Sequence, residues 1–133
     1  MNREIKFRGK RIDNGEWFFG DLMKLHTEIE LDARYIHSGV NQPVMNDFWE
    51  DFQEVIPESV GQFTGLHDKN GKEIYEGDII VRGFNSNIME VVWIKELAMF
   101  ISRGLDCHDN PYLWFDYEII GNIHDNPELL KNN

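Results

Sequence analysis

Three neighbouring residues, Cys107, His108 and Asp109, bring the most reactive side chains of this chain together. A thiol, an imidazole and a carboxylate can each bind a metal ion, and a cysteine near a histidine is one part of a nucleophilic site. Adjacent residues seldom fill one coordination sphere, however, and the sequence has no CxxC or HxxxH pair to complete it. Residues 106–111 are also rich in Asp, Asn and Pro, so we favour a turn over a catalytic or metal site.

The other histidines and the densest carboxylates do not form a recognisable site either. The histidines are scattered, in or beside predicted turns: His26, His37, His67 and His124. Four carboxylates near the middle of the chain lack the alternate spacing and central glycine of a calcium loop: Asp47, Glu50, Asp51 and Glu54. We predict a solvated acidic segment there, and no catalytic, cofactor-binding or metal-binding residues in the chain.

Four glycines at intervals of four to six residues could suggest a phosphate-binding loop: Gly61, Gly65, Gly71 and Gly77. A nucleotide loop needs a Lys-Ser or Lys-Thr pair and a strand that passes into a helix, and neither follows here. The glycine spacing is that of bends and turns. We therefore assign these glycines to architecture.

Composition limits the remaining function classes. The chain has 133 residues, one cysteine and a formal net charge of −11, and it contains no apolar run that could cross a membrane. We expect one cytoplasmic domain with no membrane partner, and no direct nucleic-acid binding, because the net charge repels phosphate backbones. A local basic strip alternates near the N-terminus, and we favour the solvent face of an edge strand over a phosphate-binding site for it: Lys6, Arg8, Lys10 and Arg11.

Apolar residues at period two, separated by turn residues, predict short strands joined in hairpins. Residues 13–15 (Asp-Asn-Gly) predict a two-residue type I′ turn, and residues 68–71 and 83–87 predict two further hairpins. Gly20-Asp21, Gly77-Asp78 and Gly121-Asn122 each precede an aliphatic residue and indicate a strand start or kink. Such corners favour a compact, strongly bent β barrel or roll.

Helical signals are few. Asn126 and Pro127 predict a short C-terminal helix. Residues 47–55 are equally compatible with a short helix and with an irregular acidic loop. The region of about residues 26–51 has the least pattern, and we expect a variable excursion there.

Aromatic side chains are abundant, and we assign most of them to the core. An alternative is a groove that holds an extended peptide. The residues in question are Trp17, Trp49, Trp93, Trp114, Tyr35, Tyr75, Tyr112 and Tyr117.

Several stretches of this chain resemble the YopX-like proteins of phages and prophages. The longest runs from Val60 to Ile80 and includes the residues Gly-Gln-Phe-Thr-Gly-Leu-His-Asp-Lys-Asn-Gly; the others are residues 3–8, 17–22, 92–93 and 118–130. The resemblance implies a mainly β fold with an SH3-type barrel component, a phage or prophage origin, assembly into a homo-oligomer and no enzymatic activity. It assigns no site residues.

The leading hypothesis is therefore a non-enzymatic accessory protein that binds a host or phage protein or assembles with itself. A first alternative is an acidic decoy that imitates DNA and occupies a host DNA-binding protein, which would need carboxylates ordered at the phosphate repeat. A second, less favoured alternative is a metal-dependent hydrolase that uses the scattered histidines and acids.

Overall fold

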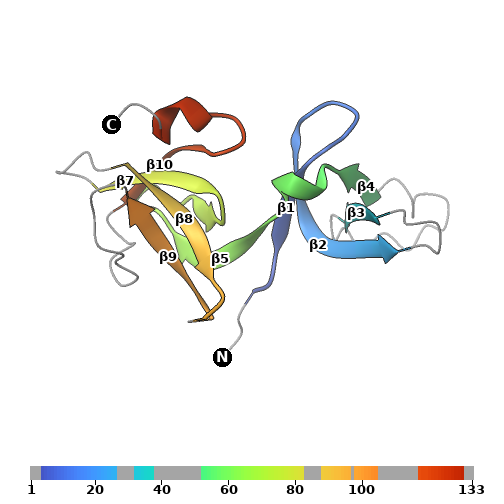
Figure 1. Ribbon diagram of the computed structural model, residues 1–133, viewed down its shortest axis with the longest axis horizontal. Helices are drawn as coiled ribbons and strands as arrows, with labels where there is room; N and C mark the ends of the chain where they lie inside the picture. Colours follow the sequence, from blue (N-terminus) through green and yellow to red (C-terminus); the bar gives the residue numbers. More distant parts are fainter. Residues whose placement is uncertain are drawn as a thin grey trace. The chain divides into compact units, whose positions relative to one another are not determined.

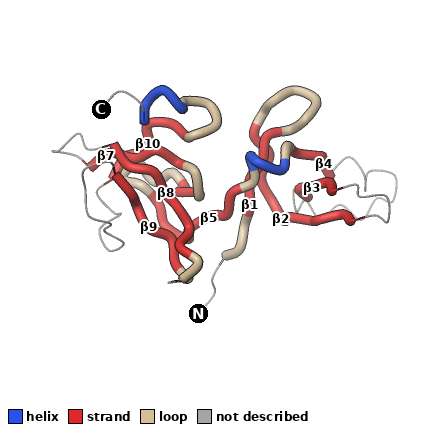
Figure 2. The backbone as a smooth tube through the Cα atoms, in the orientation of Figure 1, coloured by secondary structure: helices blue, strands red, loops and turns tan. Residues whose placement is uncertain are grey.

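The computed structural model of the protein describes residues 4–26, 32–37, 52–82, 88–96, 98–104 and 117–130. Most of these residues lie in antiparallel strands, and the helices among them are short 3-10 turns (Figure 2). The prediction of a mainly β fold is therefore confirmed. The chain separates into two compact units, Met1–Gln62 (unit 1) and Phe63–Asn133 (unit 2), which are described one at a time. The single domain expected from the sequence stays a prediction.

Unit 1 is a curled sheet of four strands to which the beginning of a fifth is added (Figure 1). The strands are β1 (Phe7–Lys10), β2 (Trp17–His26), β3 (Asp32–His37), β4 (Phe52–Val55) and β5 (Gly61–His67), in the spatial order β4-β3-β2-β1-β5. The 3-10 helix η2 (Pro57–Ser59) joins β4 to β5. Its Ser59 hydroxyl accepts a hydrogen bond from the Lys10 backbone N–H (2.8 Å) and fastens this connection to the end of β1.

The hairpin predicted between β1 and β2 is present, but its turn is not type I′. Phe7–Lys10 pairs with Trp17–Gly20, and the Arg11 N–H donates to the Glu16 carbonyl at 2.9 Å. Gly15 has a φ of +72°, whereas Asn14 does not have the positive φ that a type I′ turn requires at both central residues. The Gly15 N–H donates to the Arg11 carbonyl (3.0 Å), so a longer loop closes the hairpin.

The sheet of unit 1 curls until the end of β1 meets β4. Arg11 forms a β-bridge with Val55, the Ile12 N–H donates to the Glu54 carbonyl (3.1 Å), and the Ile56 N–H donates to the Lys10 carbonyl (2.8 Å). Val55 and Ile36 are fully buried inside the curl. Gly9 is buried against Val55 so closely that a Cβ atom at Gly9 would lie 2.8 Å from the Val55 Cβ.

Unit 2 contains the remainder of β5, a short strand that pairs with it, and a four-stranded sheet in the order β10-β7-β8-β9. The elements are β6 (Glu73–Tyr75), β7 (Asp78–Arg82), β8 (Ile88–Ile94), β9 (Met99–Gly104), β10 (Tyr117–Asn122) and the 3-10 helix η4 (Pro127–Leu130). The hairpins predicted around residues 68–71 and 83–87 are confirmed, because β5 pairs with β6 and β7 pairs with β8.

One face of the four-stranded sheet forms the core of unit 2. Alternate residues of β7, β8, β9 and β10 point to this face and pack with a residue of β6: Ile74, Ile80, Met89, Val91, Phe100 and Tyr117. Each fully buried side chain of this kind contributes about 1.5–3 kcal/mol relative to exposure. The predicted packing of aromatic side chains in the core is confirmed for Tyr75 and Tyr117.

The helix predictions are confirmed in one place and wrong in another. The C-terminal helix is present as η4, with Pro127 as its first residue. Residues 52–55 form strand β4, so the helical alternative for residues 47–55 is wrong over this part, and residues 47–51 lie outside the described residues. β3 also falls inside the region expected to be a variable excursion, yet it pairs on both sides, with β2 and β4.

Ala98 gives a stability prediction at the turn between β8 and β9. It has a φ of +51°, which costs an L-residue with a Cβ about 1–2 kcal/mol, and its N–H donates to the Lys95 carbonyl (3.2 Å). Ala98→Gly relieves this strain but adds backbone freedom to the unfolded chain, so we expect a net gain of about 0.5–1 kcal/mol in urea unfolding. Ala33→Gly, in the buried part of β3, is the control and should destabilise. Equal losses from both changes would contradict the strain at Ala98.

Candidate functional site

Only some of the residues that the sequence singled out for possible chemistry lie in the described structure. Cys107, His108 and Asp109 lie outside the described residues, as do Asp47, Glu50 and Asp51, while Glu54 lies on β4. The histidines at 26, 37 and 67 each end a different strand, and His124 lies in the turn after β10. Within the described part of the chain, no group of three His, Cys, Asp or Glu side chains is placed to hold a metal ion.

Asp68 lies in the longest stretch that resembles the YopX-like proteins, and it has a structural role. Its Oδ1 accepts hydrogen bonds from the N–H groups of Asn70 (2.8 Å) and Lys72 (2.9 Å), and its Oδ2 accepts one from Ile119 (3.0 Å). Burial alone would raise the pKa of this carboxyl group, but the three backbone donors outweigh it, and the pKa is lowered. Asp68 therefore closes the β5–β6 turn and ties it to β10.

The predicted glycine corners are also structural. Gly20 and Gly77 have positive φ angles, and Gly121 lies at a register shift in β10. The carboxylate of Asp78 accepts the Tyr75 N–H (2.7 Å), and the Asn122 side chain accepts the N–H groups of His124 and Asp125 (3.0 and 2.9 Å). Asp78 and Asn122 therefore hold bends of the backbone, as the sequence predicted, whereas Gly20 lies inside strand β2.

The basic strip near the N-terminus is not the solvent face of an edge strand. β1 lies between β2 and β5, so it is an inner strand of its sheet. Arg8 is only 7% exposed, and its guanidinium carbon lies 4.5 Å from the centroid of the Trp17 ring, with the Lys10 ammonium at 5.8 Å. Our prediction was wrong here, because it read alternation as exposure and did not anticipate a cation–π stack.

Glu90, on β8, is a carboxylate whose pKa is raised. Burial raises the pKa of its carboxyl group, the nearby charge of Arg103 lowers it, and that of Glu76 raises it further. Arg103 lies directly opposite Glu90 on β9. A half-buried carboxylate on β8 thus lies opposite an exposed arginine on β9.

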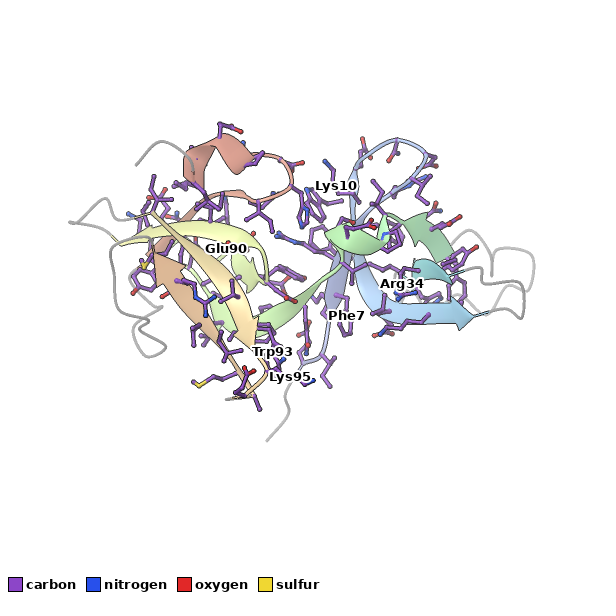
Figure 3. All side chains as sticks on the ribbon, viewed as in Figure 1. Phe7, Lys10, Arg34, Glu90, Trp93 and Lys95 are labelled. Atoms are coloured by element: carbon purple, nitrogen blue, oxygen red, sulfur yellow. The ribbon has the colours of Figure 1, made fainter. Side chains whose placement is uncertain are left out.

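Trp93 is an exposed aromatic residue of unit 2. Its side chain is 42% exposed and meets Phe100 on the neighbouring strand edge to face, with the ring centroids 4.9 Å apart. Lys95 lies beside it at the end of β8 (Figure 3). Phe100 is buried, so Trp93 covers the rim of the core of unit 2 rather than standing apart from it.

A broader candidate surface lies on unit 1, where three strands bring their side chains into two rows. The pairing of β2, β3 and β4 places Met23, Tyr35 and Glu54 side by side, and next to them Asp21, His37 and Phe52. Residues that pair across strands share a face, and residues two apart on a strand do so as well. We call these six residues the Tyr35 face.

The Tyr35 face lies opposite the side of its sheet that buries Ile36, although Ala33, the next residue of β3 on the same face as Tyr35, is also buried. The intervening residues of β3 point to the other side, where Ile36 is fully buried; Arg34, labelled in Figure 3, shares that side. On the Tyr35 face, Met23 is 37% exposed, Tyr35, His37 and Phe52 are half-buried, and Asp21 and Glu54 are exposed. The rings of His37 and Phe52 are 4.6 Å apart, so the patch has a packed aromatic centre and a carboxylate on either edge.

Sequence reasoning named Tyr35 among the aromatics that could line a peptide groove, but it did not find the rest of this face. The signal was present as alternation, in Asp21 with Met23, in Tyr35 with His37, and in Phe52 with Glu54. The cross-strand register that joins these pairs is set by tertiary pairing, and no local signal encodes it.

The chain is similar to known proteins over nearly all of its length. The model of the family described as YopX protein matches residues 6–131. The crystal structure of protein EF1440 from Enterococcus faecalis superposes with a TM-score of 0.56 and 28% sequence identity, and the match covers 97% of this chain and 99% of that one. No curated protein matches this chain significantly. Among the described residues, no helix is long and apolar enough to cross a membrane. With a family match that spans both units, this chain belongs to the YopX protein family.

Proposed function

We propose that this protein is a non-enzymatic protein-binding module and that the Tyr35 face is its binding surface. The observation that carries the proposal is the gathering of Met23, Tyr35 and Phe52 on the solvent side of one sheet. The resemblance to phage and prophage proteins supports an accessory role in the cytoplasm of a bacterial host, with a host protein, a phage protein or a second copy of the chain as the partner.

The composition of the face suits protein recognition. Tyr, Phe and Met are enriched at the centres of protein interfaces, and the aromatic side chains bury a large area with only two rotatable bonds each. Hot spots typically lie in a packed centre surrounded by polar residues. The His37 and Phe52 rings, which contact each other at a tilt, and the half-buried Tyr35 correspond to such a centre, and Asp21 and Glu54 to its polar edge.

A capture experiment with matched variants tests the proposal. Tagged wild-type protein is incubated with host lysate beside the double variant Met23→Ser/Tyr35→Ser and beside Leu66→Ser, a control on unit 2 whose side chain is 44% exposed. We expect the affinity of the double variant for a specific partner to fall at least about tenfold, equivalent to about 1.4 kcal/mol. The control should capture as much of this partner as the wild type does. Quantitative mass spectrometry of the captured proteins gives the readout.

Two further measurements make the result decisive. Far-UV circular dichroism and thermal melting check that the double variant remains folded, and sedimentation velocity of each protein detects self-association through the same face. A partner, or a self-associated species, that the double variant retains fully while folded would contradict the Tyr35 face as the binding surface.

A further inference from the structure

We propose that the segment bound by the Tyr35 face carries an arginine whose guanidinium lies over the Tyr35 ring, between the carboxylates of Asp21 and Glu54. This inference rests on the proposed function and adds the chemistry of the partner. It follows from which groups the strand register places around Tyr35.

The two rows of the Tyr35 face determine which groups surround the Tyr35 ring. Tyr35 is directly opposite Met23 on one side and Glu54 on the other, so its Cβ lies about 4.5–5.5 Å from theirs. Asp21 is its diagonal neighbour across the same strand pair, at about 7–8 Å. A planar cation stacked on the Tyr35 ring is thus within side-chain reach of a carboxylate on each neighbouring strand.

The charge of the Tyr35 face favours a cation in the bound segment. Both carboxylates are exposed, and the whole chain carries a net charge of −11, so the face attracts cations and repels acidic partners. A cation over an aromatic ring gains about 0.5–1 kcal/mol at an exposed site and more where water is displaced. The combination favours a positively charged group over a neutral one at this position.

An arginine suits this position better than a lysine. The guanidinium is planar, stacks on aromatic rings, and can donate paired hydrogen bonds to carboxylates, whereas an ammonium is a compact and strongly hydrated charge. Unit 1 uses the same contact internally, since the Arg8 guanidinium stacks on Trp17 while Lys10 lies farther from that ring.

Met23 favours an apolar residue near the arginine of the bound segment. Met23 lies next to Tyr35 and is 37% exposed, so it offers an apolar contact adjacent to the cation position. Side chains two residues apart in an extended segment point the same way and are about 6.5–7 Å apart. The Cβ atoms of Tyr35 and Met23 are about 4.5–5.5 Å apart, so a large apolar residue two positions from the arginine is near enough for its side chain to contact Met23.

The test uses a synthetic nine-residue peptide with an arginine and a leucine two positions apart, and a second peptide in which citrulline replaces the arginine. Citrulline keeps the shape and removes the charge. Binding to the full-length protein is followed by isothermal titration calorimetry and by amide chemical shifts of β2, β3 and β4. We expect the arginine peptide to bind at least about tenfold more tightly and to weaken as salt increases.

Variants assign the effect to the face. Asp21→Asn/Glu54→Gln should reduce binding of the arginine peptide to the level of the citrulline peptide, and Tyr35→Leu should weaken both. Glu118→Gln removes an exposed pair with Lys69 on unit 2 and should change nothing. Equal binding of the two peptides at β2–β4 would contradict the proposed role of the arginine and leave the protein-binding face intact. Binding without shifts in these strands, or no binding by either peptide, would overturn the inference, while the capture experiment tests the proposed function separately.

Discussion

Replacing Gly9 with alanine should destabilise the protein by about 2–4 kcal/mol, a loss at the upper end of what an overpacked core costs. Gly9 lies in β1 and is buried against Val55 of β4. An added Cβ would stand 2.8 Å from both the Cβ and the Cγ2 of Val55, closer than carbon atoms approach without displacement. Val55 is fully buried, so it has little freedom to move aside.

The measurement is urea unfolding of Gly9→Ala beside the control Gly15→Ala. Gly15 has a φ of +72° and no heavy atom within 4 Å of the added Cβ, so its substitution costs backbone strain alone, about 1–2 kcal/mol. We expect Gly9→Ala to lose clearly more stability than the control, and Gly9→Val to lose more still. A loss at Gly9 no larger than at Gly15 would contradict the close contact of β1 with β4.

Replacing Asp68 with alanine should cost about 3 kcal/mol at neutral pH, because three backbone N–H groups lose one shared acceptor. Asp68→Asn should cost less, since the amide oxygen can still accept, while its NH₂ group cannot accept from Ile119. Asp13→Ala is the control, because that carboxylate lies exposed in the first turn, and its loss should leave stability nearly unchanged. Thermal melting and urea unfolding both report the difference.

The same carboxylate gives a pH dependence with a definite sign. The pKa of Asp68 is lower in the folded protein than its ordinary value of 3.8, so the ionised group stabilises the fold above that value. This contribution is lost as the pH falls through the folded-state pKa. The stability gap between wild type and Asp68→Asn should therefore be largest near neutral pH and shrink below about pH 4. A gap that widens on acidification would contradict the hydrogen-bonded carboxylate.

Local sequence chemistry predicted the hairpins well. Residues 68–71 needed only a glycine that permits a positive φ at Gly71 and a carboxylate that accepts nearby amides, and both are present as expected. The position of the turn near Asn14 was predicted correctly, but its type was not. An Asn-Gly pair is compatible with hairpin loops of more than one length, and the strand register decides which loop forms.

The candidate site was less predictable than the turns. Chemistry-bearing residues drew attention to Cys107 and its neighbours, whereas the Tyr35 face combines ordinary residues from β2, β3 and β4. The strand β4 was itself obscured by an acidic segment whose apolar spacing fits a helix as well as a strand.

The sequence by itself determined the mainly β fold, the hairpin positions, the corners at Gly77 and Gly121, the short C-terminal helix and the family, because each depends on residues close together in the chain. Tertiary structure alone decided that Arg8 is buried on Trp17, that Gly9 touches Val55, and which side chains make up the Tyr35 face. The physical reason is that strand order and register are set by pairing between distant segments, and a shift of one residue would send every side chain to the opposite face.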